Sequence, residues 1–149
     1  MLKLTRKSEY GLIALLHIDA RQDGGLVTAK EIAETYQLPA ELLGKVLQSL
    51  AREGLVESVQ GAKGGYRLNI PIESVSLGEV IEKLEGPIVI TPCCDGSMDC
   101  RQVKTCNIRN SVQRIQEEVR EFFYSLSLSK FRSDPEVLGL TGELLPIVR

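Results

Sequence analysis

Four cysteines lie close together in the second half of this 149-residue chain. They are Cys93, Cys94, Cys100 and Cys106, and the last three have the spacing C-x5-C-x5-C. In a chain that we expect to remain in a reducing compartment, such a group is typical of metal or redox chemistry. Iron–sulfur clusters are held mostly by thiolates, because soft sulfur suits iron. The spacing therefore predicts that Cys94, Cys100 and Cys106 hold an iron–sulfur cluster, of the 2Fe–2S or the 4Fe–4S type.

Two other uses of these thiols stay open. A structural zinc site usually contains two close C-x2–4-C pairs, and the loop has none. A redox disulfide switch without metal is the second alternative. Incidental burial explains the group less well, because a polar loop with this many cysteines does not have the composition of a core.

The first 70 residues contain the start and stop signals of three helices. Ser8 is expected to cap the first helix, and Thr28 with Glu31 forms a capping box for the second. Pro39 suits the first position of the third helix, and Gly54 suits its end. The predicted helices cover residues 8–21, 29–35 and 39–53.

A glycine-rich turn separates two short predicted strands, 55–59 and 66–68, after the third helix. Three helices followed by such a hairpin is the order of a winged helix-turn-helix. In that fold the third helix enters the major groove of DNA and the hairpin reaches the neighbouring backbone. The predicted fold class is therefore mostly α with a small β-hairpin, a winged helix-turn-helix followed by a long C-terminal dimerisation helix.

Basic side chains of this region stand where contacts to phosphate would be made. They lie at the start of the second helix, along the third helix and in the hairpin, and they are Lys30, Lys45, Arg52, Lys63 and Arg67. They predict a double-stranded DNA operator as the partner. Solvated surface charges on an unrelated small α+β domain are the alternative interpretation.

The second half adds one short and one long predicted helix. Ser76 and Glu79 form another capping box, for a helix that ends near Glu85. Residues 110–128 carry a narrow apolar stripe, typical of a coiled-coil seam, which predicts a homodimer. The stripe consists of Val112, Ile115, Val119, Phe122 or Phe123, and Leu126.

The expected division of the chain follows from these elements. It is a DNA-binding domain at 1–70, a connecting helix and linker at 71–92, a cysteine loop at 93–109, a dimerisation helix at 110–130 and a C-terminal tail at 131–149.

Composition limits the class of protein. The net charge of −2 gives no global argument for nucleic acid, so the DNA interpretation depends on local placement of charge. No apolar run approaches the roughly 18 residues of a membrane span, and the start of the chain lacks an apolar signal segment. We therefore expect a cytoplasmic protein without membrane contact. A nucleophile–base pair, a phosphate loop and paired general acids are all missing, so we expect no enzyme.

The whole arrangement resembles the IscR-type family of bacterial regulators, which includes iron–sulfur assembly regulators and the nitric-oxide-sensing repressor. The matching stretches are LTRKSEY at 4–10, GLVESVQGAKGGY at 54–66 and LGEVIEKLEG at 77–86. The resemblance implies a dimer that binds an operator and is controlled by the state of its cluster. Gln60 stands where many members have Arg, and Gly44 stands where relatives can have a polar side chain that contacts the bases. The operator sequence of the relatives therefore does not carry over to this chain.

The resemblance also bears on the fourth ligand of the cluster. Members similar to the iron–sulfur assembly regulator have His three residues after the last cysteine, and here that residue is Arg109, which cannot ligate. Glu9 matches the position where the nitric-oxide-sensing type carries a carboxylate from the partner subunit. A helix-start acid favoured by the helix dipole is the plain alternative for Glu9. Cys93 and His17 are the other candidates.

These observations predict a transcriptional regulator whose operator binding is controlled by an iron–sulfur cluster that senses iron–sulfur status, oxidant or nitric oxide. A thiol-based or zinc-based winged-helix regulator without a cluster is the alternative. A small iron–sulfur redox carrier fits less well, because the hairpin and the paired capping boxes have no role in it.

Overall fold

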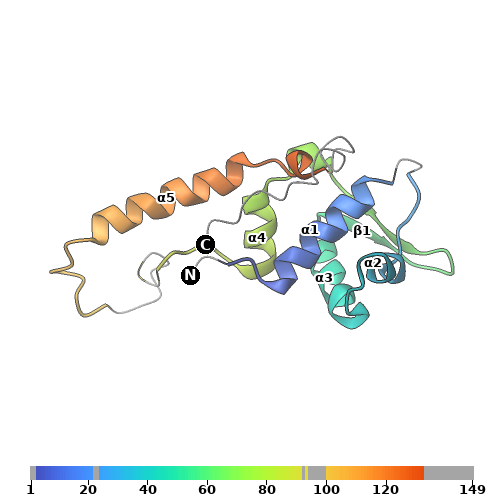
Figure 1. The fold of residues 1–149 in the computed structure, drawn as a ribbon, viewed down its shortest axis with the longest axis horizontal. Helices are drawn as coiled ribbons and strands as arrows, with labels where there is room; N and C mark the ends of the chain where they lie inside the picture. The colour runs from blue at the N-terminus through green and yellow to red at the C-terminus, as the bar shows by residue number, and fades with distance from the viewer. Residues whose placement is uncertain (1–2, 22–23, 92, 94–99, 133–149) are drawn as a thin grey trace, which may run out of the picture.

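Three helices and an antiparallel hairpin form the head of the molecule (Figure 1). The computed structural model describes residues 3–21, 24–91, 93 and 100–132. The order of elements in the head is that of a winged helix-turn-helix, mostly helical with one small hairpin, which confirms the predicted fold class. The elements are α1 (Arg6–Asp19), α2 (Ala29–Tyr36), α3 (Ala40–Arg52), β1 (Val56–Val59) and β2 (Gly65–Leu68).

The helix starts differ in detail from the prediction. The Thr28 hydroxyl accepts a hydrogen bond from the Glu31 amide at 3.1 Å, so the predicted cap of α2 is confirmed. In α1 the cap is Thr5 rather than Ser8, because Ser8 is already helical and its amide donates to Thr5. Pro39 precedes α3 as its N-cap residue instead of occupying the first helical position.

The hairpin is held in a fixed register and tied to the segment before α2. Val56 pairs with Leu68, and Val59 pairs with Gly65. Val27 forms an additional antiparallel bridge with Tyr66 through two backbone hydrogen bonds of 2.8 and 3.0 Å. Val27 therefore adds a short third strand position to one side of the two-stranded hairpin.

The described part of the second half contains α4, α5 and the short 3-10 turns η1 and η3. The elements are η1 (Ile72–Ser74), α4 (Leu77–Glu85), α5 (Arg109–Ser125) and η3 (Leu128–Phe131). The predicted long helix extended to residue 128, and the structure ends it at Ser125. The chain then turns back to the start of α4, where the Leu126 carbonyl accepts from the Leu77 amide and the Leu128 amide donates to the Val75 carbonyl.

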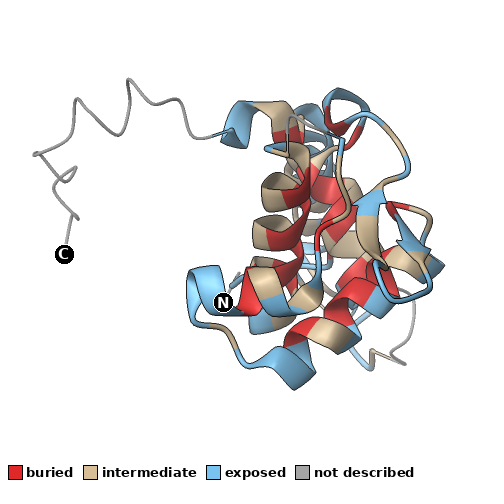
Figure 2. Cartoon of the chain, turned by 90° about the vertical axis from the view of Figure 1, so that its right-hand side faces the viewer, coloured by how far each residue is buried: buried red, intermediate tan, exposed pale blue. Residues whose placement is uncertain are grey.

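The core lies between α1, α3 and α4, and Leu128 is fully buried in it (Figure 2). Gly11 of α1 allows a close approach, since a Cβ there would lie 2.5 Å from a Leu84 methyl carbon of α4. By contrast α5 contains no buried residue and projects from the head as a rod (Figure 1). Its C-terminal end crosses α4 closely, because a Cβ at Gly78 would lie 2.5 Å from the Tyr124 ring. The core is therefore shared by the head and α4, and the C-terminal end of α5 is fixed to α4.

Candidate DNA-binding face and cysteine loop

The exposed side of α3 forms a polar stripe. Glu41, Lys45, Gln48 and Arg52 follow one another at intervals of three and four residues, and all four are exposed. The opposite side of α3 is buried in the core. The third helix of a winged helix-turn-helix inserts its exposed side into the major groove. Sequence reasoning named Lys45 and Arg52 but missed Gln48, which the helical spacing from Lys45 and Arg52 was sufficient to find.

Three of the five predicted DNA-contacting cations already pair with carboxylates of this chain. Lys30 lies 3.7 Å from Glu34, Lys45 lies 2.7 Å from Glu41, and Arg67 lies 2.8 Å from Glu57. The hydrogen bond from Arg67 lowers the pKa of the Glu57 carboxyl. Each of these pairs would have to open or rearrange before its cation met a phosphate.

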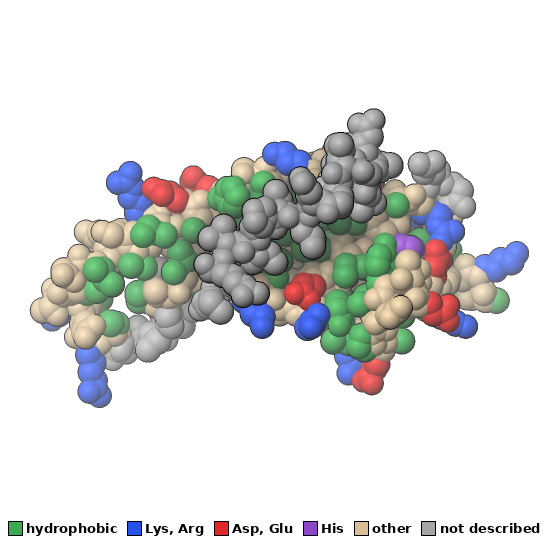
Figure 3. Space-filling view, in the orientation of Figure 1, with side chains coloured by type: hydrophobic (Ala, Val, Ile, Leu, Met, Phe, Trp, Pro, Cys, Tyr) green, Lys and Arg blue, Asp and Glu red, His purple; other side chains and the backbone are tan. Residues whose placement is uncertain are grey.

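Arg52 and Lys63 differ from those three. The Arg52 guanidinium donates to the Ser49 hydroxyl at 3.1 Å, and Lys63 is exposed at the tip of the hairpin. Neither forms an ion pair with a carboxylate in the described part of the chain. Figure 3 shows a basic side chain at the outermost point of the hairpin. These two cations are the ones available to an approaching anion.

The described part of the cysteine loop lies at the far end of the molecule from the hairpin (Figure 1). Cys100 and Cys106 are half-buried, and Cys93 is exposed with its sulfur 3.1 Å from the Thr91 hydroxyl. Cys94 lies outside the described residues. Among the residues described, no three metal-ligating side chains are grouped.

Cys100 and Cys106 flank a turn that leads into α5. The Val103 amide donates to the Cys100 carbonyl at 3.0 Å, and the Cys106 amide donates to Gln102 at 2.8 Å. The first turn of α5 has neither an acidic residue nor a side-chain cap. The uncapped N–H groups of a helix start favour a nearby negative charge.

The connector between α4 and the cysteine loop is attached to α5 by one amide side chain. Gln116 donates to the Ile88 carbonyl, and its oxygen accepts from the Ile90 amide at 2.7 Å. Next to it, Glu82 of α4 binds Arg120 of α5 at 2.8 Å. The chain entering the loop and the helix leaving it are therefore held side by side.

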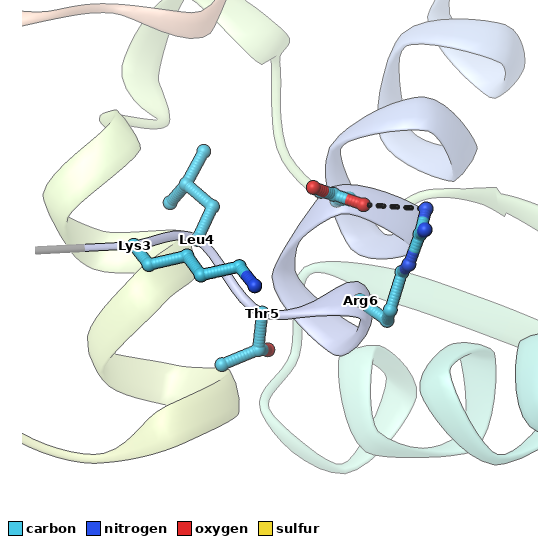
Figure 4. Close-up of a pocket in the computed structure, with 5 residues that line it drawn as sticks. Lys3, Leu4, Thr5 and Arg6 are labelled. Carbon is cyan, nitrogen blue, oxygen red and sulfur yellow. Dashed lines mark hydrogen bonds and ion pairs between the residues drawn. The ribbon is translucent and has the colours of Figure 1, made fainter.

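Glu9 lies on the first turn of α1, where its carboxylate pairs with Arg6 at 3.3 Å (Figure 4). It lines an open cleft of about 370 Å3 with Lys3, Leu4, Thr5 and Arg6. In Figure 1 the start of α1 stands apart from the segment 100–106. Among the described residues, Glu9 belongs to no group of three potential metal ligands.

His17 has both ring nitrogens engaged by neighbouring side chains. Nδ1 lies 3.1 Å from the Tyr36 hydroxyl, and Nε2 lies 3.3 Å from Glu31. Glu31 also pairs with Arg21, so the acid of the predicted capping box bonds to α1 instead of returning to its cap. His17 therefore joins α1 to α2, which argues against it as a cluster ligand.

One side of α5 carries the apolar stripe expected from the sequence. Ile115 and Phe122 are 49% and 60% exposed, and Val112 and Val119 are half-buried. In Figure 3 hydrophobic side chains are visible along this half of the molecule. The contacts with α4 use other residues of α5, namely Gln116, Arg120 and Tyr124. Leu126 is not part of the stripe, because it follows the helix and packs against the head.

Comparison with known proteins gives a consistent match. Residues 4–134 match the family model Rrf2, described as an iron-dependent transcriptional regulator. The regulator NsrR of Bacillus subtilis is 34% identical over 110 residues, which are 73% of this chain and 75% of NsrR.

Two solved structures are similar throughout. CymR, the global cysteine regulator of B. subtilis, has a TM-score of 0.69 at 30% identity, covering 89% of this chain and 98% of CymR. IscR of T. potens has a TM-score of 0.69 at 27% identity, covering 94% of this chain and 93% of IscR.

In the described residues, no helix has the length and apolar character required to cross a membrane.

Proposed function

Because the chain belongs to the Rrf2 family of transcriptional regulators, we propose that an iron–sulfur cluster on its cysteine loop controls its binding to operator DNA. The observation that carries this proposal is the position of Cys100 and Cys106 on the turn that enters α5. That helix is fixed to α4, and α4 packs on both α1 and α3. A change in the loop therefore has a short structural route to the helix that would enter the major groove.

The donor set suits such a cluster. Cys94, Cys100 and Cys106 would supply three thiolates, the ligands that iron–sulfur clusters use most. Lys104 and Arg101, between the two described cysteines, would offset the negative charge of a thiolate-bound cluster. When bound, the group would supply a redox-active centre that reacts with oxidants or nitric oxide.

Glu9 is proposed as the fourth ligand, donated by the partner subunit of a homodimer. The start of α1 stands apart from the segment 100–106 of the same chain in Figure 1, which is consistent with donation between subunits. Its carboxylate lies in an open cleft at the surface, with Arg6 as its ion-pair partner. A carboxylate binds iron less tightly than a thiolate, which suits a site that must respond to its signal.

DNA binding is proposed to use the exposed side of α3 and the hairpin of each subunit. Lys30, Lys45, Arg52, Lys63 and Arg67 are the proposed contacts to phosphate. A dimer would read two half-sites about 34 Å apart, or a multiple of that distance, because one turn of DNA separates equivalent grooves.

A regulator that senses through bare thiols is the second candidate. The likeness to CymR, a global cysteine regulator, favours it, and Cys93 is exposed. The two candidates make opposite predictions about colour and iron content.

The deciding experiment is anaerobic purification of the full chain, followed by visible absorption and by iron, sulfide and zinc analysis. Absorbance in the visible range with equal iron and sulfide supports the cluster, and colourless protein without sulfide contradicts it. Binding of the loaded and cluster-free forms to an operator selected from random-sequence duplexes then tests control. Equal affinity of the two forms would show that the cluster does not regulate binding.

A further inference from the structure

We propose that the cleft between α3 and the hairpin is the seat of a single DNA backbone phosphate, held by Arg52, Gln48 and Ser58. This inference rests on the proposed function, and it assigns one contact within the DNA-binding face. The cleft has a volume of about 380 Å3, and its lining residues come from both walls: Gln48, Ala51, Arg52, Ser58 and Tyr66.

The geometry of B-form DNA leads to this assignment. The major and minor grooves are separated by a sugar–phosphate strand. If α3 occupies a major groove and the hairpin tip reaches the adjacent minor groove, that strand must pass between them. The cleft is the space between these two elements, so a phosphate of the strand lies over it.

The chemistry of the lining fits a phosphodiester. Arg52 is the one charged residue among the described residues of the lining, and its charge is positive. Gln48 and Ser58 add neutral hydrogen-bond donors from the two opposite walls. Because no carboxylate of the described residues lines the cleft, an anion meets no repulsion from them there.

Arg52 is also the cation of α3 that is ready for such a contact. Lys45, about two turns earlier on the same side of the helix, is already engaged by Glu41 at 2.7 Å. Arg52 instead donates to the Ser49 hydroxyl at 3.1 Å, and Ser49 in turn donates to the Lys45 carbonyl at 3.0 Å. Ser49 is almost fully buried, so it holds the guanidinium in place without neutralising it. We therefore assign Ser49 as a positioning residue.

The opposite wall is rigid as well. Tyr66 forms its bridge with Val27 through both backbone hydrogen bonds and packs against the core. Ser58 lies directly opposite Tyr66 in the hairpin. A preorganised seat loses less conformational entropy when it binds its ligand.

The test combines Arg52→Gln with neutralisation of single phosphates. The probe is an operator selected from random-sequence duplexes with the full-length wild-type protein, synthesised with one methylphosphonate at a time. In the wild type we expect several phosphates per half-site whose neutralisation weakens binding. In Arg52→Gln, binding to the unmodified duplex should be about tenfold weaker, corresponding to one charge-assisted hydrogen bond. Neutralising one particular phosphate should then cost nothing further, while the other phosphates keep their effect.

Further variants separate the roles of the lining residues. Ser49→Ala should reproduce a smaller part of the same loss at the same phosphate. Gln48→Ala should weaken binding equally for all base sequences. A changed base preference would show that Gln48 contacts a base and not the proposed phosphate. Lys130→Gln, an exposed cation on η3, is the control and should leave the phosphate profile unchanged.

Two outcomes overturn the inference in different ways. If every phosphate keeps its full effect in Arg52→Gln, the cleft is not a phosphate seat although the protein binds DNA. If the wild-type protein selects no duplex at all, the proposed function itself fails. Circular dichroism of each variant shows whether the fold is retained.

Discussion

Glu82 of α4 accepts two hydrogen bonds from the Arg120 guanidinium of α5, at 2.8 and 3.0 Å. The Tyr124 hydroxyl donates to the same carboxylate at 2.6 Å. The adjacent residue, Lys83, donates to the Glu53 carbonyl at the end of α3 at 3.0 Å. Neighbouring residues of α4 thus bond to the helix that follows the cysteine loop and to the helix proposed to read DNA.

Glu82→Gln should lower the free energy of unfolding by about 1–3 kcal/mol, because hydrogen bonds to a charged group are lost in a partly buried position. The measurement is chemical denaturation at neutral pH. Glu118→Gln is the matched control, since Glu118 pairs with Arg114 on the exposed side of α5 and such surface pairs contribute little. An equal decrease in the free energy of unfolding in the two variants would show that the Glu82 pair contributes no more than a surface pair.

The same pair predicts a dependence of stability on pH. The hydrogen bonds from Arg120, assisted by Tyr124, lower the pKa of Glu82 from 4.5 to about 2 against the opposing effect of burial. A carboxyl with a lowered pKa stabilises the fold above its unfolded pKa and loses that contribution as the pH falls towards its folded pKa. The stability difference between wild type and Glu82→Gln should therefore be constant above pH 4.5 and shrink between pH 4.5 and about 2. A difference that does not change across this interval would contradict the assignment.

Dimer formation should depend on the exposed stripe of α5. Asp at both Ile115 and Phe122 places charge on the most exposed apolar positions of the helix and should give a monomer by sedimentation. The control carries Asp at Asn110 and Gln113, which adds the same charge away from the stripe. If the double variant at 115 and 122 remains dimeric, α5 does not form the dimer interface.

Visible absorbance should depend on three of the four cysteines. Changing Cys94, Cys100 or Cys106 singly to Ala should abolish it in anaerobic protein, because each removes one thiolate ligand. Cys93→Ala should retain it, since adjacent cysteines rarely bind one cluster without strain. Loss of absorbance in Cys93→Ala would instead make Cys93 the fourth ligand.

Glu9→Ala should alter both the cluster spectrum and the difference in operator affinity between the loaded and cluster-free forms. Glu9→Cys should restore a cluster with a shifted spectrum, because a thiolate replaces the carboxylate. Glu117→Ala, an exposed acid on α5, serves as the control. If Glu9→Ala changes neither property, Glu9 is only a helix-start acid.

The sequence predicted the elements better than their ends. Capping residues located α2 and α4, since the Thr28 and Ser76 hydroxyls both accept from the third following amide. The period of apolar residues misplaced the end of α5, because Leu126 continues the spacing but packs against the core after the helix has ended. Local spacing does not distinguish an apolar residue on a helix from one that packs elsewhere after the helix has ended.

Side-chain pairing across elements was beyond sequence reasoning. Lys45 and Arg52 look equivalent on a helix, yet only Lys45 is engaged by a carboxylate among the described residues. Similarly, the sequence marked Glu31 as half of a capping box, whereas its carboxylate bonds to α1. Such choices depend on which residues the fold places opposite one another.

The way Gln116 holds the connector has a consequence for how this protein can change over evolution. Its amide contacts the Ile88 carbonyl and the Ile90 N–H, which are main-chain atoms. Every residue supplies the same carbonyl, and every residue except proline supplies the N–H. The exposed side chains of Val89 and Ile90 can therefore be replaced by others while the hydrogen bonds to Gln116 persist. The sequence of the connector can thus change without loss of this attachment, provided that residue 90 does not become proline.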